Sequence, residues 1–154
     1  NKYRFLLIAG YDTDIGKTTS DEFKMPTDKA KNRLFVSVHY YTPSTYCILN
    51  EDASWGKVKN SWGTKQDYNI MDSTFSKMKK FVEEGYGVII GEYGVTRTKS
   101  GEMKEGMYEW ITNVLDNCDR YNYVPLLWDC NTFFKKTGNL GFETQELKDI
   151  YLNR

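Results

Sequence analysis

Four side chains of this 154-residue chain have the types and positions to do chemistry together. They are His39, Tyr41, Glu92 and Trp128. They stand near the ends of three apolar runs, RLFVSVHYY, GVIIGEYG and YVPLLWD, each of which has the composition of a buried strand. Because parallel sheets bind their ligands at the carboxyl ends of the strands, we expect all four side chains to share one pocket.

Side chains alternate between the two faces of a strand, which predicts where these groups point. In RLFVSVHYY, the odd positions from Phe35 to Tyr41 share one face, and the even positions from Val36 to Tyr40 share the other. The even face is uniformly bulky and is the one expected under helices. The odd face becomes polar toward its end.

The same alternation in the other two runs gives two further expectations. Glu92 should share a face with Val88 and Ile90, and Trp128 should share a face with Val124 and Leu126. Asp129 should then face away from Trp128. An acidic group at the end of a buried apolar strand costs free energy unless it is paired or takes part in function.

A carboxylate beside a Tyr hydroxyl and a His, together with a flat indole, favours a site that binds a sugar. Pyranose rings stack their C–H faces on indole, and a carboxylate can attack an oxocarbenium-like centre. Each residue also has a structural interpretation: a satisfied histidine, a buried salt bridge for Glu92, and a core position for Trp128. Their coincidence at one end of three strands favours function.

The segment GYDTDIGKTT offers a competing interpretation, a phosphate-binding loop through Gly16, Lys17 and Thr18. Such a loop needs four residues between its glycines and a helix directly after it. Here five residues separate Gly10 from Gly16, and the following segment has no apolar stripe and contains Pro26. The sequence favours a polar loop, although the longer spacing occurs in dethiobiotin-synthetase-like sequences.

Helical patterns lie between the apolar runs. Two stripes and one short pattern repeat at helical spacing. They are Met71, Phe75, Met78 and Val82, with Gly85 as a stop; Met103, Met107, Trp110, Val114 and Cys118; and Leu147, Ile150 and Tyr151. The runs at 4–10, 33–41, 87–94 and 123–129 are the expected strands. This alternation predicts an α/β fold over residues 1–154, as either a small open sheet or half of a (β/α)₈ barrel.

Composition excludes several classes of protein. Twenty-one basic and twenty-one acidic residues cancel, so no global field attracts nucleic acid or an anionic membrane. No apolar stretch approaches the roughly 20 residues of a membrane span. The cysteines at 47, 118 and 130 have no metal-type spacing and allow at most one internal disulfide. We expect neither a metal nor another cofactor.

The motifs RLFVSVHYYTP, GVIIGEYG and VPLLWD resemble the C-terminal half of glycoside hydrolase family 5 endoglucanases, most like those of rumen bacteria and anaerobic fungi. LLIAGYDTDI and FKMPTD resemble that group's fifth strand and the loop after it, which makes the Gly-Lys-Thr incidental. The resemblance covers essentially the whole chain. It implies strands five to eight of a TIM barrel and an extracellular enzyme that hydrolyses β-1,4-glucan.

The resemblance also assigns roles. It implies that Glu92 is the nucleophile of a retaining mechanism, that Tyr41 orients it, and that His39 stands near the acid/base. Trp128 would stack on the sugar next to the cleaved bond. Two further tryptophans of the long connection, Trp55 and Trp62, are candidates for binding the rest of the glucan, with loop packing as the alternative.

One departure from the family is large. Members carry the acid/base Glu on the first four strands, and this chain shows only one carboxylate at a strand end, although a retaining site needs two about 5 to 5.5 Å apart. Asp12 and Asp14 match no family motif for that role. We therefore expect the segment alone to be inactive or nearly so; glucan binding without cleavage is the alternative. Its unpaired strand edges should recruit the N-terminal half or a second copy.

Overall fold

The computed structural model describes residues 3–129 and 132–154, which form two compact units. Within the described residues, the first unit contains the segments up to Tyr40, Asn69–Tyr93 and Val114–Leu127, and the second contains the remainder. Cys130 lies outside the described residues, while Cys47 and Cys118 are buried and form no disulfide. Among the described residues, no helix combines the length and the hydropathy that crossing a bilayer requires.

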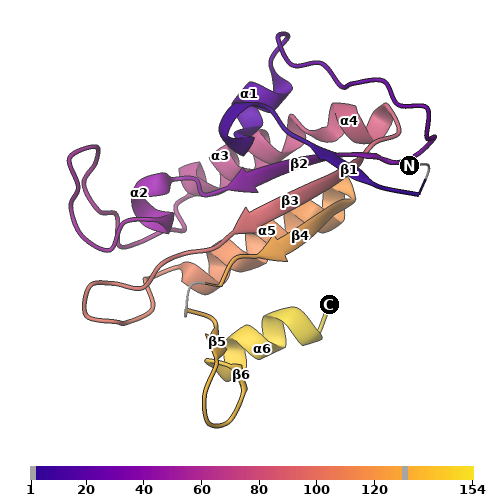
Figure 1. Cartoon of the computed structure of the whole chain (residues 1–154). Coiled ribbons are helices and arrows are strands. Elements are labelled where there is room, and N and C mark those ends of the chain that lie inside the picture. Colours follow the sequence, from indigo (N-terminus) through magenta and orange to yellow (C-terminus); the bar gives the residue numbers. More distant parts are fainter. Residues whose placement is uncertain (1–2, 130–131) are drawn as a thin grey trace. The chain divides into compact units, whose positions relative to one another are not determined.

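The first unit is built on a sheet of four parallel strands (Figure 1). They are β1 (Leu6–Ile8), β2 (Leu34–Tyr40), β3 (Gly87–Tyr93) and β4 (Tyr123–Leu127). The strands stand in the sheet in the order of the chain, and every neighbouring pair is parallel. A doubly wound sheet reverses its strand order at a switch point, so this order favours the barrel over the open sheet.

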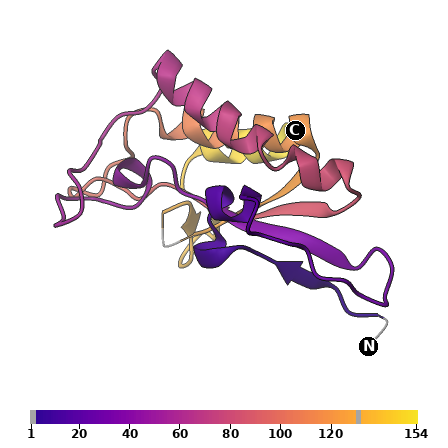
Figure 2. The same cartoon turned by 90° about the horizontal axis from the view of Figure 1, so that it is seen from above.

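One face of this sheet is buried under helices. The even positions of β2 from Val36 to Tyr40 are buried, as the alternation predicts, and Val88 and Ile90 of β3 are buried with them. The Phe75 ring of α3 (Lys65–Ser76) lies 4.8 Å from the Tyr40 ring and 6.3 Å from the Tyr123 ring, between ring centroids. Figure 2 shows the helices of this unit on one side of the sheet.

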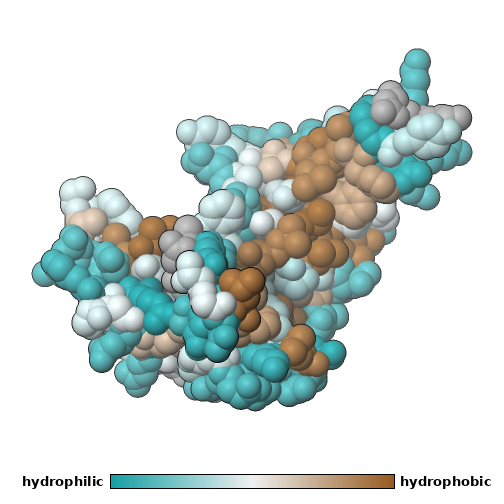
Figure 3. Space-filling model, turned by 60° about the horizontal axis from the view of Figure 1, so that its bottom comes forward, coloured by the Kyte–Doolittle hydropathy of each residue, from teal (hydrophilic) through white to brown (hydrophobic). Residues whose placement is uncertain are grey.

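The opposite face of the sheet is apolar and open. Leu7 of β1 and both Val124 and Leu126 of β4 are about half exposed, as is Phe5 just before β1. Broad apolar areas are visible on the surface in Figure 3. Within the described residues, β1 pairs only with β2 and β4 pairs only with β3, so each has an outer edge without a strand neighbour.

The predicted helices form, with one break. The stripe at Met71, Phe75 and Met78 is completely buried. However, α3 ends at Ser76 and α4 (Lys79–Glu83) begins three residues later, so one predicted helix is two. The second stripe lies in α5 (Met107–Tyr121) from Met107 onward, whereas Met103, its first predicted member, precedes the helix. The final helix is α6 (Gln145–Leu152).

The second unit contains elements that the sequence did not indicate. They are the short helix α2 (Ser44–Cys47) and the hairpin of β5 (Phe134–Lys135) and β6 (Gly141–Phe142). Its core gathers large side chains from segments far apart in the sequence: Tyr46, Trp62, Met107, Trp110, Phe133 and Leu147. The Tyr46 hydroxyl donates to the Glu105 carbonyl at 2.9 Å, and the Trp110 indole donates to the Thr42 carbonyl at 3.1 Å.

Asp67 organises the start of α3. Its carboxylate accepts bonds from Lys59 Nζ (2.6 Å), Thr64 Oγ1 (2.8 Å) and the backbone N–H groups of Thr64 (3.0 Å) and Gly63 (3.2 Å). Burial alone would raise the pKa of this carboxyl, but these donors outweigh it and lower the pKa from 3.8 to about 2. The charged carboxylate thus ties the loop after Lys59 to the helix.

We expect Asp67→Asn to lower the free energy of unfolding by about 2 kcal/mol at neutral pH, because a pKa change of one unit is worth about 1.4 kcal/mol. The folded-state pKa is depressed, so the contribution is complete above pH 4 and is lost as the pH falls toward 2. Urea unfolding at pH 7 and pH 2.5 measures this. Asp21→Asn, at an exposed position, is the control. An equal loss for Asp67→Asn at both pH values would contradict the assignment.

Candidate active site

A β-bulge places Glu92. In the pairing of β2 with β3, Val38 aligns with Ile90, but His39 aligns with Glu92 and Tyr40 with Tyr93. Two residues of β3, Gly91 and Glu92, therefore oppose one residue of β2. The prediction that Glu92 shares a face with Val88 and Ile90 is wrong, because the extra residue turns Glu92 to the side of His39.

Glu92 and His39 form a pair at the carboxyl ends of β3 and β2. His39 Nδ1 lies 3.2 Å from Glu92 Oε2, and the two side chains are 31% and 26% exposed. The carboxylate is thus held by a neighbour and still reachable from solvent, unlike a buried structural ion pair. This geometry allows Glu92 to act as a nucleophile or a base while the imidazole fixes the carboxylate's orientation.

Gly91 makes room for this pair. A Cβ at position 91 would lie 2.9 Å from Ser37 Oγ and 3.5 Å from His39 Cδ2. Any larger residue would therefore push against the side chains of β2 that face it. The glycine before Glu92 thus serves both the bulge and the close approach of His39.

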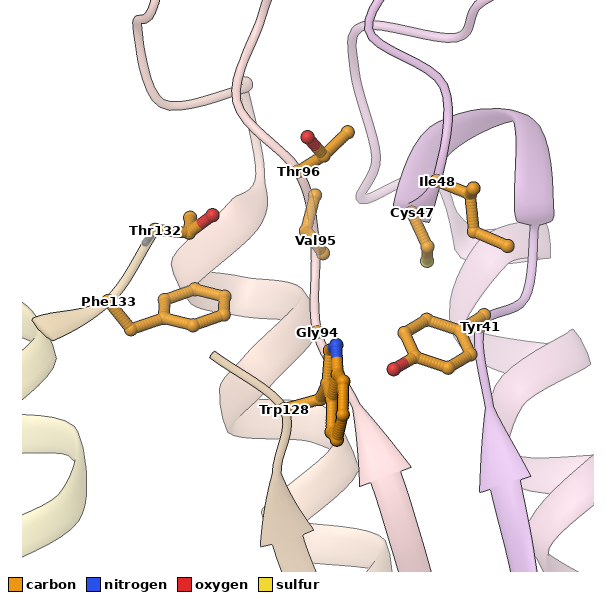
Figure 4. Close-up of a pocket in the computed structure, with 9 residues that line it drawn as sticks. All are labelled: Tyr41, Cys47, Ile48, Gly94, Val95, Thr96, Trp128, Thr132 and Phe133. Atoms are coloured by element: carbon orange, nitrogen blue, oxygen red, sulfur yellow. The ribbon is translucent and has the colours of Figure 1, made fainter. Parts of the chain in front are cut away.

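The second unit contains a pocket that brings Tyr41 and Trp128 together. Its volume is about 320 Å³. It is lined by residues from the segments that follow β2, β3 and β4 in the chain (Figure 4): Tyr41, Cys47, Ile48, Gly94, Val95, Thr96, Trp128, Thr132 and Phe133. Trp128 is 50% exposed, so its indole is accessible rather than a core residue. Sequence reasoning found two of these residues and missed the others.

A carboxylate and a guanidinium bond the backbone of Thr132 and Phe133. Asp129 Oδ1 accepts bonds from the backbone N–H groups of Thr132 (3.0 Å) and Phe133 (2.8 Å), and Asp129 Oδ2 lies 3.2 Å from Lys136 Nζ. Although burial opposes it, these partners hold the pKa of Asp129 below its usual value. Arg97 donates to the Thr132 carbonyl at 2.9 Å. Asp129 therefore shapes the pocket wall through its loop.

The other two tryptophans that were predicted to bind sugar differ in their exposure. Trp55 is 56% exposed, on a turn closed by reciprocal backbone bonds between Ala53 and Gly56 (3.0 and 3.2 Å). Trp62 is 6% exposed and its ring lies 4.5 Å from that of Tyr68, between centroids. Burial favours the alternative interpretation of Trp62, loop packing. Trp55 stays a predicted sugar contact.

We expect Trp62→Ala to cost about 3 kcal/mol of stability or more, as for other buried aromatics. Trp55→Ala, at an exposed turn, should change stability by less than about 0.5 kcal/mol. Denaturant unfolding of both variants makes the comparison, and each serves as the other's control. Equal losses would show that the two indoles have equivalent packing roles.

The Gly-Lys-Thr segment is occupied by bonds of its own chain. The Gly10 N–H donates to Thr18 Oγ1 at 3.0 Å, and Asp14 Oδ1 accepts from the Lys17 N–H at 2.7 Å. The helix here, α1 (Ile15–Thr19), has only five residues. The Thr18 hydroxyl and the backbone N–H groups of Gly10 and Lys17 are thus already hydrogen-bonded within the segment. This favours the polar-loop interpretation.

Four parallel strands in chain order, with helices on one face and an acid at a strand's carboxyl end, define part of a (β/α)₈ barrel enzyme. The chain belongs to glycosyl hydrolase family 5: the family's model, described as Cellulase, matches residues 1–134. This confirms the recognised family and its fold, with this chain as half of a TIM barrel, and it places the chain among the glycoside hydrolases.

Individual relatives agree. The chain is 34% identical to a xyloglucan-specific endo-β-1,4-glucanase of Bacteroides ovatus over 84% of its length, and 31% identical to endoglucanase A of Paenibacillus barcinonensis over 92%. A broad-specificity GH5-4 endoglucanase from an uncultured bovine rumen ciliate superposes with a TM-score of 0.80 at 29% identity, covering 97% of this chain. The chain spans 28%, 39% and 47% of these three proteins, respectively, so it corresponds to less than half of each.

Proposed function

We propose that the protein containing this segment hydrolyses β-1,4-glucan with retention of configuration, and that Glu92 is its nucleophile. The observation that carries the proposal is the bulge that presents Glu92 beside His39 at a strand's carboxyl end. Two of the similar proteins are named endo-β-1,4-glucanase and endoglucanase, and a Bacteroides ovatus xyloglucanase at 28% identity has been solved with a XXXG heptasaccharide. These names support a glucan substrate.

In the proposed reaction, the Glu92 carboxylate attacks the anomeric carbon, the bond to the leaving oxygen breaks, and a glycosyl-enzyme ester forms. A second carboxyl group protonates the leaving oxygen, then removes a proton from the water that cleaves the ester. We propose that this group comes from the other strands of the barrel, so that the segment alone has almost no activity. The roles of Tyr41, Trp128 and Trp55 stay predictions, as does action outside the cell.

A mechanism-based label tests the proposal. A 2-deoxy-2-fluoro-cellobioside with a good leaving group slows hydrolysis of the ester more than its formation, so a complete barrel that contains this segment should accumulate a stable adduct. Mass spectrometry of peptides should place the adduct on Glu92. A label on another carboxylate, or inversion of configuration in the product, would overturn the proposal.

The open face and edges of the sheet give a prediction about association. We expect the isolated 18.0 kDa chain to elute as an oligomer or to aggregate, because unpaired apolar strands recruit partners. Introducing a charge with Leu7→Lys or Val124→Lys should shift the chain toward monomer in light scattering. Leu152→Lys, at an exposed position of α6, is the control. A parent chain that stays monomeric at about 50 µM would contradict the prediction.

A further inference from the structure

Two exposed tyrosines lie at opposite ends of β1. Tyr3 precedes the strand and is 71% exposed, whereas Tyr11 follows the strand and is 77% exposed. Neither ring is buried enough to contribute much to the core, although aromatic side chains usually carry a large share of core packing. Because ligands bind at the carboxyl ends of parallel strands, Tyr11 is the one of the two that lies at the functional end of the sheet.

The turn that carries Tyr11 is strained. It is the short 3-10 helix η1 (Tyr11–Thr13), in which Asp12 has φ of +56° and Thr13 has φ of +54°. Two consecutive residues other than glycine in this conformation cost free energy, which the surrounding contacts must offset. Such strain is concentrated at ligand-binding sites, so it makes this turn a candidate for binding.

Hydrogen bonds fix the strained turn on both sides. The Thr13 N–H donates to the Gly10 carbonyl at 3.1 Å, and the Asp14 N–H donates to the Tyr11 carbonyl at 3.2 Å. The Gly10 N–H donates to Oγ1 of the completely buried Thr18, and a Cβ on Gly10 would lie only 2.8 Å from that oxygen. The backbone of Tyr11 is therefore preorganised, which lowers the cost of ordering it when a ligand binds.

The register of the sheet brings Tyr11 toward the level of Glu92. Ile8 aligns with Val36 in the pairing of β1 with β2, and both η1 and α1 lie against β2 (Figure 1). Continued for three residues beyond Ile8, this register reaches His39, which aligns with Glu92. One strand separates β1 from β3, so their carboxyl ends are about 10 Å apart. A glucan that extends from Glu92 toward β1 therefore meets Tyr11 with a unit other than the one attacked.

We propose that the Tyr11 ring stacks on a glucose unit of the glucan, outside the unit that Glu92 attacks, and so makes the enzyme favour long chains over short ones. The flat ring packs against the apolar C–H face of the pyranose, while the phenol and the sugar hydroxyls stay in water. This inference rests on the proposed function, because it takes a β-glucan as the substrate that extends over Glu92.

The first test compares two substrates of different length in a complete barrel that contains this segment. Tyr11→Ala should lower kcat/KM on cellohexaose at least about fivefold, through KM rather than kcat, because the contact is equal in the ground state and the transition state. An aryl-cellobioside is too short to reach Tyr11, so its kcat/KM should change by less than about twofold. Tyr11→Phe, which keeps the ring, should behave like the parent.

Tyr3→Ala is the matched control, since it removes an equally exposed tyrosine from the other end of the same strand. It should leave kcat/KM within about twofold on both substrates. Circular dichroism checks that each variant is folded.

Binding measured without cleavage separates this inference from the proposed function. In a Glu92→Gln barrel, Tyr11→Ala should weaken cellohexaose at least about fivefold in calorimetry, whereas Tyr3→Ala should not. The inference is overturned if these two variants bind cellohexaose alike, if Tyr11→Phe is as weak as Tyr11→Ala, or if kcat/KM falls equally on both substrates. If Tyr11→Ala weakens binding but the fluoro-sugar does not label Glu92, the binding contact is supported and the proposed nucleophile is wrong.

Discussion

Glu92→Gln is expected to lower kcat/KM on cello-oligosaccharides by about 10³-fold or more in a complete barrel that contains this segment. Glutamine has nearly the same shape but cannot form the glycosyl ester, so substrate binding should survive while turnover is lost. The His39 contact at 3.2 Å also loses its charged partner. Initial rates on an aryl-cellobioside, with binding of cellotetraose measured separately, distinguish the two effects.

The control for this prediction is Glu146→Gln. Glu146 lies in the first turn of α6 and is exposed, so its replacement should leave kcat/KM within about twofold. If Glu92→Gln keeps more than a tenth of the parent activity, Glu92 is not the nucleophile. Restoration of turnover by azide in Glu92→Ala, with an α-glycosyl azide as product, would support the assignment independently.

The alternation of side chains predicted β2 well because that strand is regular. One face of this strand is bulky and buried, and the other changes from Phe35 to the polar Ser37 and His39. Only the bulky face can therefore pack against the helices. The apolar stripes predicted the helices for the same reason, because each stripe has a single apolar face. Met71, Phe75, Trp110 and Val114 repeat at a spacing that only one helical face can bury.

Glu92 was placed on the wrong face because the period of two fails at a bulge. One additional residue reverses the side on which every later side chain points. The sequence contained a signal, since an isolated glycine in a strand marks a bulge or a close backbone approach, and Gly91 does both. The correction strengthens the site, because it brings the carboxylate to the histidine.

The pocket could not be predicted in the same way. Its wall residues come from three separate connections, and loops carry no periodic pattern that would bring Ile48 to Phe133. Trp62 shows the related difficulty: exposed and buried indoles of one loop look alike in sequence. Only the packing of Tyr68 on Trp62 and the open turn at Trp55 separate them.

Gly106→Ala is expected to be the most destabilising of the glycine substitutions, costing about 3 kcal/mol or more. Gly106 has φ of +77°, a conformation that strains any L side chain, and it precedes α5. A Cβ there would also collide with the Trp62 carbonyl carbon and oxygen, which are backbone atoms and cannot swing away. The Trp62 N–H meanwhile donates to the Glu105 carbonyl at 3.1 Å, so the two backbone segments are locked together.

Gly101→Ala is the matched control for this substitution. Gly101 has φ of +88°, close to that of Gly106, but an added Cβ there would meet nothing within 4 Å. Its replacement should therefore cost only the backbone strain, about 1 to 2 kcal/mol. The difference between the two free energies of unfolding isolates the collision with Trp62. If the two variants unfold at the same denaturant concentration, the approach of the Trp62 backbone to Gly106 does not constrain the fold, and the anchoring of the loop before α5 must rest on Lys104, whose ammonium donates to the Tyr46 and Leu49 carbonyls.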